Sequence, residues 1–161
     1  MTVLVDSDVL IEVSRQRDHD LLSKWTALAE SDNAILCSPV SSAELWAGAW
    51  PREHEALTKL LRTLLCAPID FETGRQAGDY LRQYRKSHGL QISDALIAAA
   101  AVLNHAELWT RNRKHYPMKE LFFYSTPHSS PKAAPTALLG YPPRFAGQTP
   151  RMLKPSRGPR S

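Results

Sequence analysis

The chain has 161 residues, and its 20 Lys and Arg against 16 Asp and Glu give a formal net charge of +4 and a pI of about 9.2. Its longest apolar stretch, near residues 95–103, is shorter than the roughly 20 residues of a membrane-spanning helix, and Met1 is not followed by the basic and apolar regions of a signal peptide. We therefore expect a cytoplasmic protein with no membrane span, and only one folded domain fits in this length.

The positive charge is concentrated at one end of the chain. Residues 126–161 contain six basic residues, no acidic residue and eight of the twelve prolines, whereas residues 1–125 contain 14 basic and 16 acidic residues, a net charge of −2. The Pro-rich segment has neither helical nor strand periodicity, and its composition predicts disorder, with a basic arm for RNA or a partner as the alternative. We therefore expect a folded domain over 1–125 and a basic tail over 126–161.

Short strand-like runs alternate with longer helical stretches along residues 1–125. Strands are predicted at 3–5, 34–37, 64–69, 107–110 and 121–125, and helices at 9–15, 19–31, 42–49, 53–64, 72–87 and 94–104. This order indicates an α/β fold with a parallel sheet flanked by helices, in which ligands bind beyond the carboxyl ends of the strands. Cys37 and Cys66 lie in strand-like runs without metal-binding spacing, which favours two buried thiols.

Three acidic residues stand where this fold would place chemistry. Asp6 ends the first strand in VLVDSDVLIEV, two residues before Asp8, and could bind a ligand or cap the next helix. Glu44 lies in SPVSSAELWAG, where Ser41 and Glu44 also match a capping box. Asp94 opens the most apolar helix, where an acid also stabilises the helix dipole. If the three acids meet at one crevice, their repulsion requires a cation, and their hard oxygens suit Mg²⁺ or Mn²⁺ and phosphoryl transfer to water.

A polar segment, LWTRNRKHYPM, follows the predicted strand at 107–110. The carboxyl end of that strand would present three polar side chains, those of Thr110, Asn112 and His115, to a ligand. Alternatively, Thr110 and Asn112 could simply form turn hydrogen bonds, and His115 could be a surface histidine. Nearby bases, namely Arg111, Arg113, Lys114 and, less directly, Arg15, could hold an RNA backbone or belong to a solvated charged surface.

Four blocks in this order, VLVDSDVLIEV, SSAELWAG, ISDALIAAAAV and LWTRNRKHYPM, resemble those of the PIN-domain ribonucleases, and in particular the VapC toxins of bacterial type II toxin–antitoxin systems. The resemblance spans residues 1–125. It implies a three-layer α/β/α fold with a mostly parallel central sheet. It also implies a Mg²⁺-dependent endoribonuclease, for which Mn²⁺ could substitute, with products carrying a 5′-phosphate and a 3′-hydroxyl.

The resemblance also assigns site residues. Asp6, Glu44 and Asp94 match the three metal-binding acids of the family, Ser7 and Thr110 match hydroxyl positions beside them, and Asn112 matches a polar position. Many members carry a further acid where this chain has His115, which leaves open whether one or two metal ions bind.

The implied partners are an RNA substrate, a VapB-type antitoxin that masks the site, and a second copy of the chain in a homodimer. An apolar group could supply the dimer interface or belong to the core: Trp46, Trp50, Leu57, Leu60, Leu61 and Leu64. The sequence does not identify the RNA or the antitoxin.

Two other functions compete with this interpretation. The DSD after the first strand is similar to the DxD of haloacid-dehalogenase-type phosphatases. That motif is followed shortly by Gly and Thr, whereas this chain has Val9, Leu10 and Ile11 there. The second alternative is a PIN-like module that binds a partner or DNA without cleaving, which the His115 replacement and the unusual tail keep open.

Overall fold

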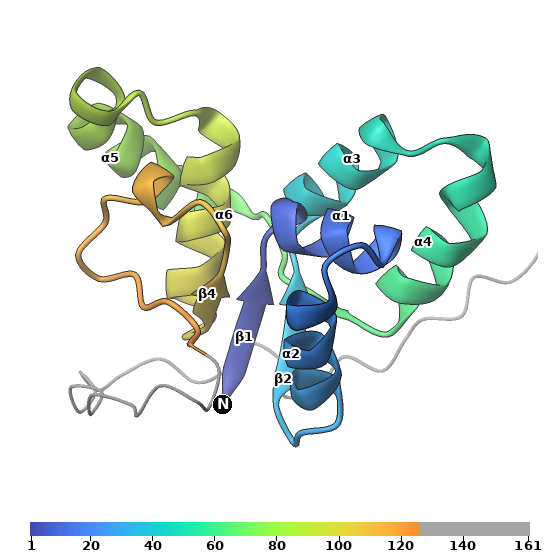
Figure 1. Ribbon diagram of the computed structural model, residues 1–161. Helices are drawn as coiled ribbons and strands as arrows, with labels where there is room; N and C mark the ends of the chain where they lie inside the picture. Colours follow the sequence, from blue (N-terminus) through green and yellow to red (C-terminus); the bar gives the residue numbers. More distant parts are fainter. Residues whose placement is uncertain (126–161) are drawn as a thin grey trace, which may run out of the picture.

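A computed structural model describes residues 1–125 (Figure 1). Four short strands and six helices alternate along this part of the chain, with two short 3-10 helices, η1 (Pro51–Glu53) and η2 (Arg113–His115). The elements are β1 (Thr2–Val5), α1 (Ser7–Arg15), α2 (His19–Ala29), β2 (Ala34–Cys37), α3 (Pro39–Gly48), α4 (His54–Arg62), β3 (Leu65–Cys66), α5 (Phe71–His88), α6 (Ile92–Leu103) and β4 (Glu107–Trp109).

The four strands form one parallel sheet in the order β3-β2-β1-β4. In the centre of the sheet, Leu4 of β1 stands beside Leu36 of β2 on one side and Leu108 of β4 on the other. Because all four strands run the same way, their carboxyl ends share one edge, and the residues that follow β1 and β4 are brought together there.

Each face of the sheet is covered by its own helices and core. Leu4 points into a core with residues of α5 and α6, whereas Val3 and Val5, on the opposite face, pack with residues of α1, α2 and α4. Figure 1 shows α5 and α6 on one side of β1 and α1, α3 and α4 on the other. The expected three-layer α/β/α fold with a parallel sheet is therefore confirmed.

The helix α6 approaches the sheet closely because it presents small side chains. Its four consecutive alanines, Ala98 to Ala101, are completely buried, and α6 also contacts α5 and α3. This packing fixes the position of the first turn of α6, which carries Asp94.

The helix α3 begins three residues before the predicted start at residue 42. Ser38 is its N-cap and accepts the Ser41 N–H at 3.0 Å, and Pro39 occupies the first turn, where its fixed φ suits a helix start. The capping box of Ser41 and Glu44 is therefore wrong: Ser41 lies inside the helix, and Glu44 lies beyond its first turn.

Two further expectations are corrected at the edges of the sheet. The predicted strand at 121–125 is only an isolated parallel bridge between Leu108 and Phe123. Two backbone hydrogen bonds form this bridge to β4: the Leu108 N–H donates to the Phe122 carbonyl, and the Tyr124 N–H donates to the Leu108 carbonyl. The predicted strand at 64–69 shortens to two residues, and Cys66, on this edge strand, is exposed, whereas Cys37 is buried as expected.

The apolar group considered for a dimer interface divides between core and surface. Leu57 is buried, and Leu60, Leu61 and Leu64 pack against the same core, whereas Trp46 and Trp50 are exposed. No helix within residues 1–125 is long and apolar enough to cross a membrane. The expectation for the tail, 126–161, lies outside the described residues.

Candidate active site

Asp6 follows β1 directly and caps the helix after it. It is the N-cap of α1, where its Oδ1 accepts the Ser7 N–H at 2.7 Å. Its Oδ2 accepts the hydroxyl of Tyr116, also at 2.7 Å. The residue is only 6% exposed, so the end of β1 places a buried, doubly hydrogen-bonded carboxylate at the carboxyl edge of the sheet.

Glu44 reaches the same edge from α3 and is exposed. Its Oε2 accepts the hydroxyl of Ser7 at 2.5 Å, and that hydroxyl oxygen lies 3.4 Å from Asp6 Oδ1. Ser7 therefore links the carboxylates of Asp6 and Glu44.

Asp94 arrives from the opposite helical layer, in the first turn of α6. Burial raises the pKa of its carboxyl group, and the negative charges of Asp6 and Glu44 raise it further, while His115 lowers it. The His115 Nδ1 lies 3.8 Å from Asp94 Oδ2, and the Asp94 side chain is 18% exposed. Asp94 therefore lies within the electrostatic influence of both other acids, and His115 is the basic group beside it.

The segment after β4 is tied to the first turn of α1 by Asp8. Asp8 Oδ2 accepts the Arg111 N–H at 2.9 Å and the Thr110 hydroxyl at 3.3 Å. The Thr110 hydroxyl oxygen in turn accepts the Asn112 N–H at 3.0 Å, and the Asn112 side-chain amide contacts the His115 ring. Thr110 thus contacts Asp8, and Asn112 supports the histidine that faces Asp94.

Asp8 is itself an unusual carboxylate. Burial, followed by the charge of Asp6, raises its pKa from 3.8 to about 6, and its buried Oδ1 has no hydrogen-bond partner within the described part of the chain. Negative charge is therefore crowded and poorly solvated around the first turn of α1.

The four bases proposed for RNA binding differ in their surroundings. The Arg111 Nη1 lies 3.3 Å from Glu12 Oε1. The Arg113 guanidinium donates to the Tyr124 carbonyl at 3.1 Å and lies 5.0 Å from the centre of the Phe123 ring. Lys114 is exposed next to His115, and Arg15 is exposed in the last turn of α1. Lys114 and Arg15 are thus the bases with charged groups most open to a ligand.

The donor chemistry of the three acids fits a hard divalent cation. They offer only carboxylate oxygens, as Mg²⁺ prefers, and the pKa of Asp94 is raised chiefly by burial, with smaller contributions from the charges of Asp6 and Glu44. Among residues 1–125, however, no three His, Cys, Asp or Glu side chains stand close enough together to hold a metal ion without rearrangement. The residues therefore suit Mg²⁺ by type and location, and Glu44, which is exposed, is held on this edge by its hydrogen bond from Ser7.

Two residues of this site, Asp8 and Tyr116, were not predicted to act in it. The contacts of Asp8 lie 102 and 103 residues away and that of Tyr116 lies 110 residues away, so local patterns do not show them. One signal was present: a Tyr in an apolar environment needs a hydrogen-bond partner for its hydroxyl. Burial, and then the charge of Asp6, raises the pKa of Tyr116 far above its usual value, so the hydroxyl keeps its proton and donates.

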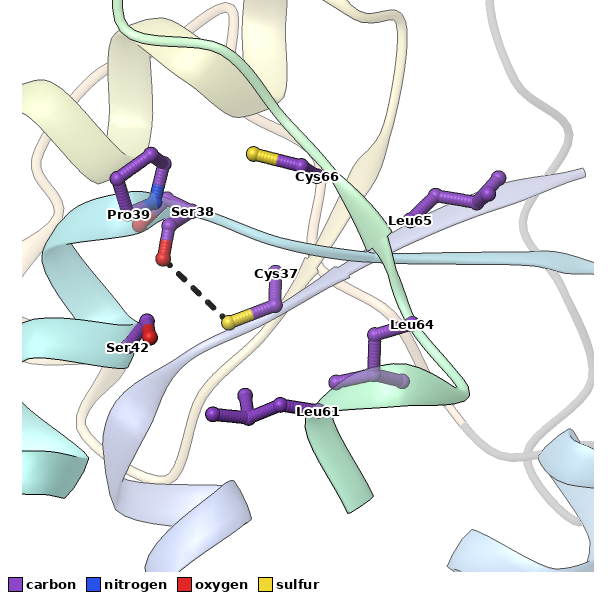
Figure 2. Close-up of a pocket in the computed structure, with 8 residues that line it drawn as sticks. All are labelled: Cys37, Ser38, Pro39, Ser42, Leu61, Leu64, Leu65 and Cys66. Carbon is purple, nitrogen blue, oxygen red and sulfur yellow. Dashed lines mark hydrogen bonds between the residues drawn. The ribbon is translucent and has the colours of Figure 1, made fainter. Parts of the chain in front are cut away.

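A separate pocket of about 250 Å³ opens where β2 and β3 end. Figure 2 shows both cysteines in its lining, with the Cys37 thiol 3.4 Å from the Ser38 carbonyl oxygen, to which it donates. The other lining residues are Pro39, Ser42, Leu61, Leu64 and Leu65. None of the three acids lines this mostly apolar pocket, so it is distinct from the carboxylate site.

Comparison with known proteins relates the chain to one family. The family model described as PIN domain matches residues 3–121. Ribonuclease VapC10 of Mycobacterium tuberculosis is 38% identical over 119 residues, which cover 73% of this chain and 88% of that protein.

Solved structures show the same fold. VapBC2 from Rickettsia felis, bound to a DNA fragment from its promoter, matches with a TM-score of 0.65 and 23% identity, over 77% of this chain and 98% of the matched chain. VapBC-1 from nontypeable Haemophilus influenzae matches with a TM-score of 0.64 and 18% identity, over 77% and 97% of the two chains. The similarity covers the part of the chain that carries the three acids.

Proposed function

Because the chain belongs to the PIN-domain family, we propose that it is a VapC-type toxin, a Mg²⁺-dependent endoribonuclease that hydrolyses RNA phosphodiester bonds. The observation that supports this proposal is that Ser7 links the carboxylates of Asp6 and Glu44 at the carboxyl edge of the sheet, and that the charges of both raise the pKa of Asp94. The 38% identity to a protein named ribonuclease VapC10 supports the same reaction.

The three acids would hold the metal, and the surrounding residues would set their orientation. Asp6 and Asp94 are the proposed direct ligands of Mg²⁺, with Mn²⁺ as a substitute, and Glu44 binds directly or through water. When bound, the metal supplies positive charge that activates the attacking water and stabilises the phosphate in the transition state. Ser7 orients Glu44 through its hydroxyl, and Asn112 supports His115 beside Asp94.

The substrate must approach an acidic edge, so basic groups are needed at its rim. Lys114, exposed beside His115, is well placed to meet an RNA phosphate, and Arg111 and Arg113 precede it on the same segment. Contacts of this kind hold the backbone of RNA without reading its sequence. They leave the choice of RNA to other parts of the surface.

The proposal includes a VapB-type antitoxin as the partner that neutralises the nuclease. The two solved structures described above are named VapBC2 and VapBC-1, and we extend that assembly of toxin and antitoxin to this chain. A homodimer is also part of the proposal, and Trp46 and Trp50 are among the exposed apolar side chains that would favour such a contact.

The phosphatase alternative has no support in the structure. The phosphatase motif has Gly and Thr shortly after its DxD. In this chain Val9 and Leu10 stand there and are completely buried in helix α1. The non-cleaving PIN-like module remains the alternative that an experiment must separate from a nuclease.

Cleavage of structured RNA tests the proposed reaction. Purified protein in Mg²⁺ should cut RNA at internal positions, excess EDTA should stop the reaction, and added Mg²⁺ should restore it. Product length on a denaturing gel gives the readout. Cleavage that continues in EDTA contradicts the metal-dependent mechanism, and RNA binding without cleavage identifies the non-cleaving module.

A further inference from the structure

The hydroxyl of Tyr116 is built into the base of the acidic site. It donates to Asp6 Oδ2 at 2.7 Å across 110 residues of sequence, and this hydrogen bond is buried. Tyr116 is 4% exposed and Asp6 is 6% exposed. Neither group can therefore replace its partner by bulk water without opening the surrounding structure.

The ring of Tyr116 is held rigidly. It belongs to the same core as Met118, Leu121 and Leu108 of β4, and it meets the Phe123 ring edge-on, with centroids 6.5 Å apart and planes at 70°. The hydroxyl is thus presented by a packed side chain, which makes it a fixed donor.

The segment that carries Tyr116 is fixed as well. Asp8, in the first turn of α1, accepts the Arg111 N–H at 2.9 Å, and Asp6, the N-cap of α1, accepts the Tyr116 hydroxyl, so both ends of the segment from Arg111 to Tyr116 are attached to the start of α1. Asp6 Oδ1 meanwhile accepts the Ser7 N–H at 2.7 Å. Each oxygen of Asp6 therefore has its own short donor, which defines a single orientation of the carboxylate.

We infer that Tyr116 is a positioning residue for Asp6, which orients this carboxylate for a divalent cation without contacting the cation or the RNA. The inference rests on the proposed function, because Asp6 is a proposed metal ligand there. Groups that hydrogen-bond to metal ligands fix the ligand orientation, and their removal typically weakens metal binding by about 10- to 100-fold.

Mg²⁺ binding to the metal-stripped full-length chain tests the inference without any RNA. Tyr116→Phe removes the hydroxyl and keeps the ring, so the core packing is retained. We expect calorimetry to show a Kd for Mg²⁺ about 10- to 100-fold higher than in wild type. Tyr124→Phe is the matched control, because Tyr124 is equally buried but packs against Trp109 in the other core, and its Kd should equal that of wild type.

Three outcomes would overturn the role of Tyr116. The first is a Kd of Tyr116→Phe for Mg²⁺ equal to that of wild type. A lower melting temperature of this variant with unchanged Mg²⁺ affinity counts as the same outcome, because it shows a contribution to stability alone. The second is an equal loss of affinity in Tyr124→Phe. The third is an absence of Mg²⁺ binding in wild type, which removes the metal-dependent function as well and is thereby distinguished from the first two.

If Tyr116→Phe does not fold at the temperature of the titration, the calorimetry is repeated at a lower temperature at which circular dichroism shows it folded. Wild type and Tyr124→Phe are measured at that same temperature, and equal Mg²⁺ Kd values in all three proteins overturn the inference.

Discussion

Asp6 combines an observed structural role with a proposed functional role in one side chain. As the N-cap of α1 it satisfies the Ser7 N–H, and as a buried acid at the end of β1 it faces the Tyr116 hydroxyl. A helix that begins directly after a strand thus gains stability from the same carboxylate that the proposed reaction uses. Capping and ligand binding are therefore compatible interpretations of this residue.

The two cysteines should differ in reactivity. Burial raises the pKa of Cys37 from 9.0 to about 12, and only the thiolate form is nucleophilic. At pH 8 we expect iodoacetamide to modify Cys66, which is exposed, and to leave Cys37 unmodified until the protein is unfolded in urea. Peptide mass spectrometry of the folded and unfolded samples measures both positions.

The direction of the pH effect on Cys37 follows from the raised pKa. Its protonated thiol contributes stability that is fully present below about pH 9 and is lost as the pH rises through about 12. Modification of Cys37 in the folded protein at pH 8, at the rate found for Cys66, would contradict the buried, protonated thiol.

At the scale of elements, the segment after β4 depends on Asp8. Asp8→Ala removes the acceptor for the Arg111 N–H and the Thr110 hydroxyl, and we expect a loss of about 1–3 kcal/mol in the free energy of unfolding. Asp8→Asn keeps a carbonyl acceptor and removes a charge beside Asp6, so it should recover at least half of this loss. Urea denaturation at pH 7 gives both values.

Two results would show that Asp8 does not anchor this segment. Asp8→Ala could unfold at the same urea concentration as wild type, or Asp8→Asn could be as unstable as Asp8→Ala. Either outcome would mean that packing around Trp109 and Tyr116 holds the segment after β4 without this hydrogen bonding.

Sequence patterns predicted the elements better than their boundaries. Apolar runs located β1, β2, β4 and all six helices, because burial of one face leaves a periodic pattern. The start of α3 was misplaced because Ser38 and Ser41 both offer a capping hydroxyl, and only the structure shows that Ser38 is the cap.

The site was predictable to the extent that its residues have local signals. Asp6, Glu44 and Asp94 each stand at a strand end or near a helix start, and the structure brings them to one edge. Asp8 and Tyr116 could not be assigned, because their roles depend on partners more than 100 residues away. The buried position of Cys66 was wrong because a sequence run does not show that β3 is an edge strand.

On the scale of the whole molecule, the parallel sheet explains why the acids lie at the same edge. Asp6 follows a central strand, Glu44 comes from α3 on one face and Asp94 from α6 on the other. The overall charge of +4 conceals this acidic site, because residues 1–125 carry a net charge of −2. The proposed link to RNA therefore depends on carboxylates that bind a cation, with bases at their rim.

The most direct test of this account compares RNA cleavage by Asp94→Asn and Asp32→Asn in saturating Mg²⁺. Both substitutions remove one negative charge, but Asp32 is exposed in the turn between α2 and β2, at the amino end of the sheet. We predict that Asp94→Asn lowers the cleavage rate by more than about 100-fold, the upper end of the loss found when a hydrogen-bond partner of a metal ligand is removed, and that Asp32→Asn cleaves at the wild-type rate. Wild-type cleavage by Asp94→Asn, with circular dichroism showing both variants folded, would contradict the assignment of the carboxyl edge of the sheet as the active site.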